Sequence, residues 1–485
     1  MRKAKIVCTI GPATASLSML ERLIESGMDA ARLNFSHGTH ESHASAIAAI
    51  RQVAEQRRVA VSIIQDVQGP RIRVGKLADE GIEVRAGQLV CVRMISVRTG
   101  DDAALQSHTL PSSPVPEIPV IYPSLTRDIR PGARILINDG LVELIADRIS
   151  DGSVECIVAI GGRILSYKGI NLPGTNVSMP TLTDKDREDI RFGVSQGVDY
   201  VALSFVRGPE DIVAARALLA ECDGNQPIIA KIERAEAVDA LDMILEQADG
   251  VMIARGDLGV EMGPEAVPVL QKRIIAEANR RRRLVITATQ MLESMTQALR
   301  PTRAEASDVA NAVFDGTDAV MLSAETAVGA HPIETVRVMD RIIRAAEEAA
   351  EPSVLPKRQT DMEHLSFPEA ICTAASSAAQ AISAHAIVAF SEHGATARLI
   401  SKQRPAPPII AFTPFEPVRQ RMALYWGVRP YAMPQIEQTD ARVTEAERRS
   451  KEEGLVKTGE KIVILSGTRV GHPGGTNLIK LHEVG

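Results

Sequence analysis

The chain has few aromatic residues and no excess of positive charge. Phe, Trp and Tyr make up 3% of its 485 residues, the formal net charge is −6, and the pI is about 6.0. Proteins that bind nucleic acid present a positive field to the phosphates and aromatic side chains to the bases. We therefore expect no nucleic-acid partner.

Cysteine and long apolar runs are also scarce. The five cysteines are scattered, odd in number and without a C-x-x-C pair, which argues against a disulfide framework and a structural zinc site and favours a reducing cytoplasm. The first apolar run, Ala4 to Ile10, is too short for a secretory signal, and no run approaches the roughly 18 apolar residues of a membrane span. We expect a soluble, cytoplasmic protein with no membrane partner.

The sequence does contain a repeated alternation of strand and helix patterns. Its length of 485 residues predicts two or three domains. Short apolar, β-branched runs are each followed by a helix-length pattern, which indicates parallel βα units. One helix is expected between an N-cap at Ser16 and a terminating Gly27. Eight runs form one series: Lys5–Ile10, Ala31–Phe35, Val61–Gln65, Tyr200–Phe205, Pro227–Ile232, Gly250–Ala254, Leu284–Ala288 and Ala319–Leu322. They predict a (β/α)8 TIM barrel, whose chemistry lies at the C-terminal ends of the strands.

Two further domains are expected. The segment between the third and fourth runs is rich in Val, Ile, Gly and Pro and lacks helical periodicity, which predicts an inserted small all-β domain. A second βα series, with strands near 386–390, 409–412, 461–466 and 477–482, predicts a C-terminal open α/β domain. We assign 1–69 and 171–345 to the barrel, 70–170 to the insertion and 346–485 to the C-terminal domain.

Polar side chains follow the ends of the predicted barrel strands, among them Glu233 after the fifth and Asp257 after the sixth. Neighbouring strands lie about 4.8 Å apart, so these two carboxylates can converge on one divalent ion. Two carboxylates with substrate oxygens and water suit Mg²⁺ or Mn²⁺ rather than zinc. Ion pairing of the carboxylates with Lys231 or Arg255 would explain the same residues without a metal.

Basic residues accompany these acids. Lys231 precedes Glu233 by two positions, so both side chains point to the same side of a strand. An ammonium group there can neutralise charge on a phosphoryl group in transfer, and Arg32 and Arg73, near other strand ends, could bind the same anion. The turn Ala254–Gly259 adds backbone N–H groups that suit a carboxylate or phosphate.

Eight motifs resemble those of the pyruvate kinase family and occur in the family's order along nearly the whole chain. They are Thr9–Pro12 (TIGP), Ala31–Gly38 (ARLNFSHG), Asn171–Gly174 (NLPG), Lys231–Glu233 (KIE), Ile253–Glu261 (IARGDLGVE), Ala288–Met295 (ATQMLESM), Pro301–Glu305 (PTRAE) and Leu322–Thr326 (LSAET). The resemblance implies a phosphotransferase that moves the phosphoryl group of phosphoenolpyruvate to ADP, giving pyruvate and ATP. It also implies that the inserted domain closes as a lid and excludes water.

The resemblance further implies roles for individual residues. Glu233 and Asp257 would hold Mg²⁺ or Mn²⁺, and Lys231 and Arg32 would stabilise the phosphoryl group. Thr289 would lie near the methylene carbon of the enolate, where a proton is delivered through water. Substrate binding is expected from Arg32, Lys231, Ala254, Arg255, Gly256, Asp257 and Thr289, with the backbone of residues 254–256 at the substrate carboxylate. Nucleotide binding is expected from Arg32, Asn34, His37, Arg73 and Lys185.

The chain departs from the family where many members hold a potassium ion. The matching positions Asn34, Ser36 and Asp66 are present, but the family's threonine is Val67 and its glutamate is Arg71. Since an arginine carries a permanent positive charge, we expect Arg71 to replace the potassium charge and the activity not to require K⁺. Alternatively, Arg71 points to solvent.

The C-terminal domain contains a counterpart of the family's effector loop. Ser391, Gly394 and Thr396 could form an anion-binding nest, and the glycine-rich segment 471–476 could fold over it. Glu392 places a negative charge there, so a phosphorylated allosteric effector is expected to be a monophosphate or nucleotide rather than fructose 1,6-bisphosphate. The resemblance also suggests a homotetramer.

Two alternatives belong to other functional classes. Magnesium-dependent barrel lyases that act on pyruvate or oxaloacetate enolates also place a Glu and an Asp on strand ends, but they lack the inserted domain, the Arg32–Asn34 pair and a counterpart of Lys185. A non-catalytic sensor on the same scaffold would have lost catalytic positions. None of Arg32, Lys231, Glu233, Asp257 and Thr289 is missing.

Overall fold

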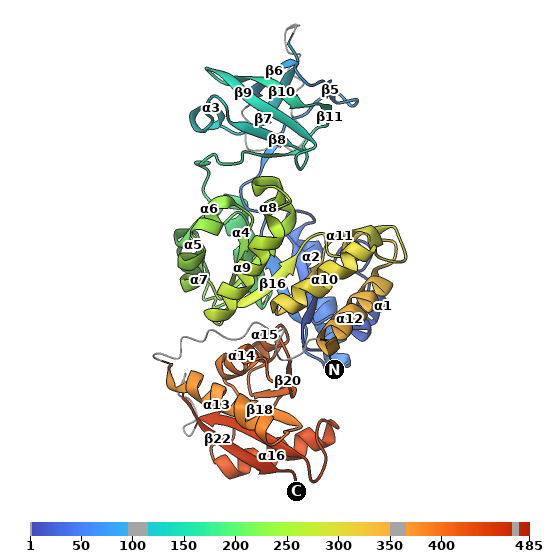
Figure 1. The fold of residues 1–485 in the computed structure, drawn as a ribbon, viewed down its shortest axis with the longest axis vertical. Helices are drawn as coiled ribbons and strands as arrows, with labels where there is room; N and C mark the ends of the chain where they lie inside the picture. The colour runs from blue at the N-terminus through green and yellow to red at the C-terminus, as the bar shows by residue number, and fades with distance from the viewer. Residues whose placement is uncertain (1, 96–114, 350–364, 468–474) are drawn as a thin grey trace.

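The computed structural model describes residues 2–95, 115–349, 365–467 and 475–485. They form three bodies stacked along the long axis of the molecule, with the inserted β domain at the top, the barrel in the middle and the C-terminal α/β domain at the bottom (Figure 1). The predicted fold class is therefore confirmed. Among the helices of these described ranges, none combines the length and apolar character needed to cross a bilayer.

The central barrel closes with eight parallel strands that follow one another in chain order, with the insertion between β3 and β13. Its strands are β1 (Lys5–Thr9), β2 (Ala30–Asn34), β3 (Ser62–Asp66), β13 (Tyr200–Leu203), β14 (Ile228–Ile232), β15 (Gly250–Ala254), β16 (Leu284–Ala288) and β17 (Ala319–Leu322). Every strand predicted for the barrel is present. Their side chains fill two cores, one inside the barrel and one between the strands and the surrounding helices.

Four of the surrounding helices, α1, α2, α4 and α10, begin at a residue whose side chain caps the first turn. In the first, the Ser16 side chain accepts a hydrogen bond from the Met19 N–H, and Gly27 ends the helix at a φ of 118°, as predicted. The helices are α1 (Leu17–Ser26), α2 (His40–Gln56), α4 (Asp184–Ser195), α5 (Pro209–Glu221), α6 (Ala235–Asp239), α7 (Leu241–Gln247), α8 (Arg255–Met262), α9 (Val267–Arg280), α10 (Arg303–Asp315), α11 (Ala324–Ala327) and α12 (Pro332–Ala349), with a 3₁₀ turn at Glu293–Thr296.

The inserted domain is a second closed barrel around its own apolar core. Its elements are β4 (Ile72–Val74), β6 (Leu89–Met94), β7 (Glu117–Ile121), β8 (Arg134–Ile137), β9 (Val142–Ser150), β10 (Ser153–Ile160) and β12 (Gly169–Asn171), beside a small sheet of β5 (Ile82–Val84) and β11 (Gly162–Ile164) and one short helix, α3 (Leu125–Asp128). Its first and last barrel strands, β4 and β12, pair with each other. Both connections to the central barrel therefore leave from one place, which suits a hinge.

The C-terminal domain is an open sheet in the order β20-β19-β18-β21-β22, with β22 antiparallel to β21. Its elements are α13 (Phe367–Ala381), β18 (Ala386–Phe390), α14 (Ala395–Lys402), β19 (Ile409–Thr413), α15 (Glu416–Met422), β20 (Val428–Ala432), α16 (Thr439–Glu452), β21 (Lys461–Gly467) and β22 (Thr476–Glu483). One strand, β20, was not predicted, and it contains Pro430. Because β20 is an edge strand, the missing N–H of that proline is tolerated.

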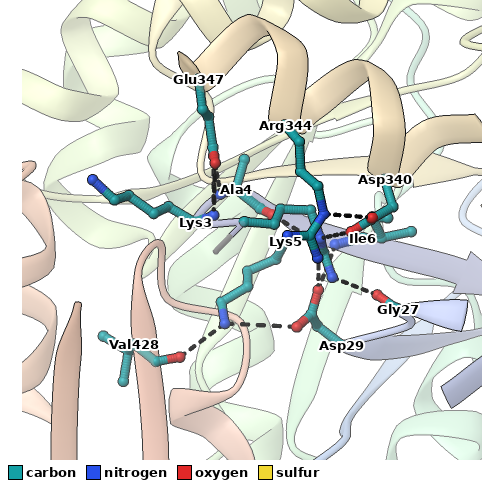
Figure 2. Close-up of polar contacts among 11 residues, drawn as sticks. Lys3, Ala4, Lys5, Ile6, Gly27, Asp29, Asp340, Arg344, Glu347 and Val428 are labelled. Carbon is teal, nitrogen blue, oxygen red and sulfur yellow. Dashed lines mark hydrogen bonds and ion pairs between the residues drawn. The ribbon is translucent and has the colours of Figure 1, made fainter. Parts of the chain in front are cut away.

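Charged residues at the start of the chain join the barrel to α12 and to the C-terminal domain (Figure 2). The backbone N–H of Lys3 donates to Glu347 on α12, and the Lys5 ammonium donates to the Val428 carbonyl at 2.8 Å. Asp29 lies 3.6 Å from the same ammonium. These contacts fix the N-terminal rim of the barrel against β20.

Candidate active site

The C-terminal ends of the barrel strands carry polar side chains directly above the apolar interior. Ile229 on β14 belongs to the core inside the barrel, and because strand side chains alternate, Lys231 and Glu233 point to the same side. The same rule places Asp66 above Ile64 on β3. Apolar side chains thus fill the barrel up to the layer where charged side chains begin.

Lys231 lies at the centre of this polar layer. Its ammonium is 2.8 Å from Glu233 Oε1 and 3.3 Å from Asp66 Oδ1, and it donates to Ser204 Oγ at 2.7 Å. Burial alone would lower the pKa of Lys231, but the charges of Asp66 and Glu233 outweigh it and hold the pKa above its usual value. The side chain is therefore a buried ammonium that is protonated at neutral pH.

Asp66 on β3 contacts both Lys231 on β14 and Arg32 on β2. Arg32 Nε donates to Asp66 Oδ2 at 2.7 Å, and Arg32 Nη1 donates to Thr9 Oγ1 at 3.1 Å. Burial works against the charged carboxylate, yet Lys231 and Arg32 hold the pKa of Asp66 below its usual value. The predicted phosphate-binding cations Arg32 and Lys231 are thus brought together around one carboxylate.

The two predicted metal ligands also lie on one side of the barrel. β14 and β15 are neighbours, and Glu233 and Asp257 follow their ends. Glu233 is 2% exposed, and its Oε2 accepts a hydrogen bond from the Phe205 N–H at 2.7 Å. Burial and then the charge of Glu233 raise the pKa of Asp257 to about 6.

A divalent cation between Glu233 and Asp257 would relieve the repulsion between their two carboxylates. The two side chains therefore fit such an ion as ligands. Within the described ranges, no cluster of three or more His, Cys, Asp or Glu side chains could hold a metal. Any ion here would depend on two carboxylates together with substrate oxygens and water. Of the ion pairs considered from sequence, Glu233 does pair with Lys231, whereas Arg255 pairs with Asp308.

Thr289 follows the end of β16 in a conformation that is unusual for a residue other than glycine. Thr289 and Gln290 have φ values of 65° and 53°, and such backbone positions cost on the order of 1 kcal/mol each. The Gly256 N–H, in the first turn of α8, donates to Thr289 Oγ1 at 2.8 Å. The predicted proton-donating hydroxyl and the predicted carboxylate-binding turn are therefore in direct contact.

The residues assigned to the nucleotide lie around the opposite side of the rim. Lys185 Nζ donates to the Phe35 carbonyl at 2.8 Å and to Asp189 Oδ2 at 2.6 Å. Arg73 lies on β4 of the inserted domain and donates to the Tyr167 carbonyl at 3.2 Å. Burial and the charges of Arg71, Arg73 and Arg32 lower the pKa of His37, so these groups share one region.

The positions matched to the potassium site form a turn beside Asp66. Asn34 Oδ1 accepts a hydrogen bond from the Ser36 N–H at 3.1 Å, and Val67 is buried at 2% exposure. Arg71 is exposed, but its charge lowers the pKa of His37 and opposes the raised pKa of Asp257. Its positive charge therefore reaches the predicted metal and nucleotide groups even though its side chain is solvated.

The predicted effector loop borders a cavity of about 220 Å³ in the C-terminal domain. Ser391, Thr396 and Thr476 line it, and Thr396 Oγ1 lies 2.6 Å from Thr476 Oγ1. Gly394 is the N-cap residue just before α14, has a φ of 83° and does not line the cavity. Residues 471–474 of the segment expected to fold over the loop lie outside the described ranges.

Two side chains of these sites, Ser204 and Arg442, had no predicted role. Ser204 accepts a hydrogen bond from Lys231 and donates one to the Val67 carbonyl at 2.7 Å. Its position directly after the fourth barrel strand could have indicated a place in the site. Arg442 on α16 lines the effector cavity, is 7% exposed, and its Nε has no hydrogen-bond partner among the described residues. Its guanidinium lies 5.1 Å from the Phe390 ring, and nothing in the sequence pattern places it there.

Known proteins are similar to this chain over nearly its whole length. The family model for the pyruvate kinase barrel domain matches residues 1–336, and the model for the pyruvate kinase alpha/beta domain matches residues 369–482. Pyruvate kinases from two strains of Staphylococcus aureus are 44% identical to this chain over 487 aligned residues, which cover 100% of the chain and 81% of each relative. The crystal structure of a pyruvate kinase from Cryptosporidium parvum superposes with a TM-score of 0.88 at 37% identity and covers 100% of this chain and 96% of that one. The barrel lyases are thereby excluded, and the chain belongs to the pyruvate kinase family.

Proposed function

We propose that this chain transfers the phosphoryl group of phosphoenolpyruvate to ADP with Glu233 and Asp257 holding one Mg²⁺ or Mn²⁺ ion. The observation that carries the proposal is the buried Lys231 ammonium, which lies 2.8 Å from Glu233 and beside the raised-pKa carboxyl of Asp257. When bound, the divalent ion supplies positive charge that stabilises the enolate leaving group.

The protein's own groups perform the remaining tasks. Lys231 and Arg32 face the same carboxylate, Asp66, and present two cations to the phosphoryl group while it moves between oxygens. At the start of α8, after Ala254, the Arg255 N–H holds the substrate carboxylate, while the neighbouring Gly256 N–H donates to Thr289 Oγ1.

The proton for the enolate comes from the side of Thr289, whose hydroxyl contacts the same turn. Protonation of the enolate gives the ketone, which makes phosphoryl transfer strongly favourable in the direction of ATP. In this scheme Thr289 supplies the proton through a water molecule, and the α8 turn sets where the enolate carbon lies.

The nucleotide lies between the barrel rim and the inserted domain in this proposal. Asn34, His37 and Lys185 come from the barrel, whereas Arg73 comes from the base of the insertion next to its two connections. Closure of the insertion would bring Arg73 and the phosphates together and remove water that would otherwise accept the phosphoryl group.

Potassium independence is a further part of the proposal. A cation held by Asn34, Ser36 and Asp66 would add one positive charge next to the nucleotide phosphates. Arg71 already places a positive charge that reaches His37 and Asp257. We expect equal initial rates in sodium and tetramethylammonium buffers, and a many-fold rise on addition of KCl would reject this part.

The proposal also includes an allosteric effector in the C-terminal domain and a homotetrameric assembly. The cavity lined by Ser391, Thr396 and Arg442 offers hydroxyls and one buried guanidinium, which suits a single phosphate group. Glu392 also lines it and disfavours a second phosphate. We further propose that the protein is cytoplasmic and forms a homotetramer. Gel filtration with light scattering would test the tetramer.

Binding of Mn²⁺, followed by electron paramagnetic resonance, tests the metal site separately from catalysis. We expect Glu233→Gln and Asp257→Asn each to weaken Mn²⁺ binding at least tenfold, because each removes one of only two protein ligands. Glu236→Gln is the matched control, since Glu236 is a carboxylate three residues further on that pairs with Arg234 at 3.0 Å. Equal Mn²⁺ affinity in all three variants would reject the assignment. A parent enzyme that forms no pyruvate from phosphoenolpyruvate and ADP would instead favour the non-catalytic alternative.

A further inference from the structure

A buried guanidinium beneath the active-site rim joins the start of α8 to the Thr289–Gln290 turn, the two backbone segments to which the proposed function assigns substrate contacts. Arg255, the first residue of α8, is 7% exposed. Its Nη2 donates to the Thr289 carbonyl at 2.8 Å and to the Gln290 carbonyl at 3.0 Å, and its Nε donates to the Thr289 carbonyl at 3.2 Å. Three of its hydrogen bonds thus converge on two consecutive peptide groups.

Those two peptide groups belong to the residues with positive φ. Neither Thr289 nor Gln290 is a glycine, so surrounding contacts must maintain their left-handed conformation. The Thr289 hydroxyl accepts from the Gly256 N–H and donates to the Ala288 carbonyl at 2.7 Å. The direction of that hydroxyl therefore depends on the turn that the guanidinium holds.

The guanidinium is itself fixed from the opposite side. Arg255 Nη1 lies 2.6 Å from Asp308 Oδ2 on α10 and donates to Gln271 Oε1 on α9 at 3.2 Å. Gln271 in turn donates to Asp315 at 2.9 Å. The planar fork of an arginine can satisfy all of these acceptors at once, which a lysine ammonium cannot.

We propose that the side chain of Arg255 is a positioning residue for the proton-transfer step, acting by holding the Thr289–Gln290 turn so that the Thr289 hydroxyl faces the enolate carbon. This role differs from substrate binding by the backbone N–H of the same residue, and it rests on the proposed function of Thr289. Phosphoryl transfer depends on Lys231 and Arg32, on other strands, and is less sensitive to this turn.

The two chemical steps can be measured separately. ATP formation reports phosphoryl transfer. Exchange of pyruvate methyl hydrogens in D₂O, followed by NMR with Mg²⁺ and ATP present, reports proton transfer: one C–H bond breaks, its proton passes to solvent, and a deuteron from D₂O forms the new C–D bond. A merely structural defect lowers both rates by the same factor and leaves their ratio unchanged.

The test compares Arg255→Lys with Arg283→Lys. Arg283 lies at the other end of β16 and also donates to two consecutive carbonyls, those of Leu245 at 2.9 Å and Glu246 at 3.0 Å. We expect the ratio of exchange to ATP formation to fall about tenfold or more in Arg255→Lys and to stay at the parent value in Arg283→Lys. An unchanged ratio in a folded Arg255→Lys variant overturns the proposal.

If Arg255→Lys does not fold, Asp308→Asn provides the same test, because it removes the anchor of the guanidinium and leaves the guanidinium in place. A smaller fall in the ratio, about threefold, is then expected, and a parent-like ratio overturns the proposal. A parent enzyme that makes no ATP from phosphoenolpyruvate and ADP would mean that the proposed function has failed. An active parent with an unchanged ratio in the variants would mean that only the role of Arg255 has failed.

Discussion

The carboxylate of Asp318, just before β17 of the barrel, lies 2.5 Å from the ammonium of Lys402, the last residue of α14 in the C-terminal domain. The side chains are 1% and 3% exposed, and Arg404 lies 2.8 Å from the other carboxylate oxygen. Burial lowers the pKa of Lys402 to about 8, although Asp318 opposes that shift. The first residues of α14 line the effector cavity, so one helix spans the distance from that cavity to the barrel.

Loss of this buried anion should destabilise the protein strongly. In Asp318→Asn two buried cations lose the carboxylate that both of them contact, and we expect the free energy of unfolding to fall by about 3–5 kcal/mol. Urea unfolding can be followed by the fluorescence of Trp426, the chain's one tryptophan, which lies 4.7 Å from the Arg404 guanidinium.

The matched control for that variant is Asp242→Asn. Asp242 is 65% exposed and lies 3.1 Å from Arg281, and an exposed pair of this kind contributes about 0–1 kcal/mol. If both variants lost the same small amount of stability, the interdomain pair would have no special role.

Divalent-ion binding should weaken in mild acid. Burial and Glu233 raise the pKa of Asp257 to about 6, and only the deprotonated carboxylate binds a metal ion. Mn²⁺ affinity should therefore be constant above about pH 7 and fall by up to about tenfold per pH unit below pH 6. Binding of Mn²⁺ measured from pH 5 to pH 8 tests this expectation, and Asp257→Asn should remove the dependence. A flat profile in the parent would contradict it.

Potassium dependence should be introduced by restoring the family's residues. In a Val67→Thr, Arg71→Glu double variant the permanent charge is lost and a carboxylate that favours a monovalent cation is gained. We expect its rate in tetramethylammonium buffer to fall about tenfold or more and KCl to restore it, whereas Arg71→Lys should remain independent of K⁺. Equal rates of the double variant with and without KCl would show that Arg71 does not replace the ion.

The effector cavity should distinguish one phosphate group from two. We expect glucose 6-phosphate to lower the half-saturating phosphoenolpyruvate concentration of the parent and to have no effect on Arg442→Gln, because the buried guanidinium is lost. Glu392→Gln removes the acid that lines the cavity and should allow a response to fructose 1,6-bisphosphate. Activation of the parent by the bisphosphate alone would contradict this expectation.

Local patterns in the sequence were sufficient to predict the barrel and the placement of Lys231 and Glu233 on one side of a strand. The two-residue spacing of Lys231 and Glu233 placed them on one side of β14, and the structure confirms this with their 2.8 Å contact. The cap at Ser16 and the glycine at Gly27 gave the ends of α1, as the structure shows. Each of these predictions depends on neighbours within a few positions along the chain.

The features that the sequence did not reveal depend on contacts between distant segments. Pro430 argues against a strand unless β20 is known to lie at an edge of the sheet. The Arg255 side chain turns toward Asp308 on α10 because α9 packs beside α8 and α10 beside α9, and no local pattern encodes that direction. The Lys402–Asp318 pair joins residues 84 positions apart in two domains.

A coupled assay of pyruvate formation with ADP and Mg²⁺, comparing Lys231→Met with the parent, tests the central claim most directly. If the ammonium acts mainly on the phosphoryl group in transfer, kcat falls on the order of 10²–10³-fold, while the Kd for phosphoenolpyruvate changes by less than about threefold. A kcat within about twofold of the parent, or a loss of phosphoenolpyruvate binding as large as the loss of rate, would contradict the account.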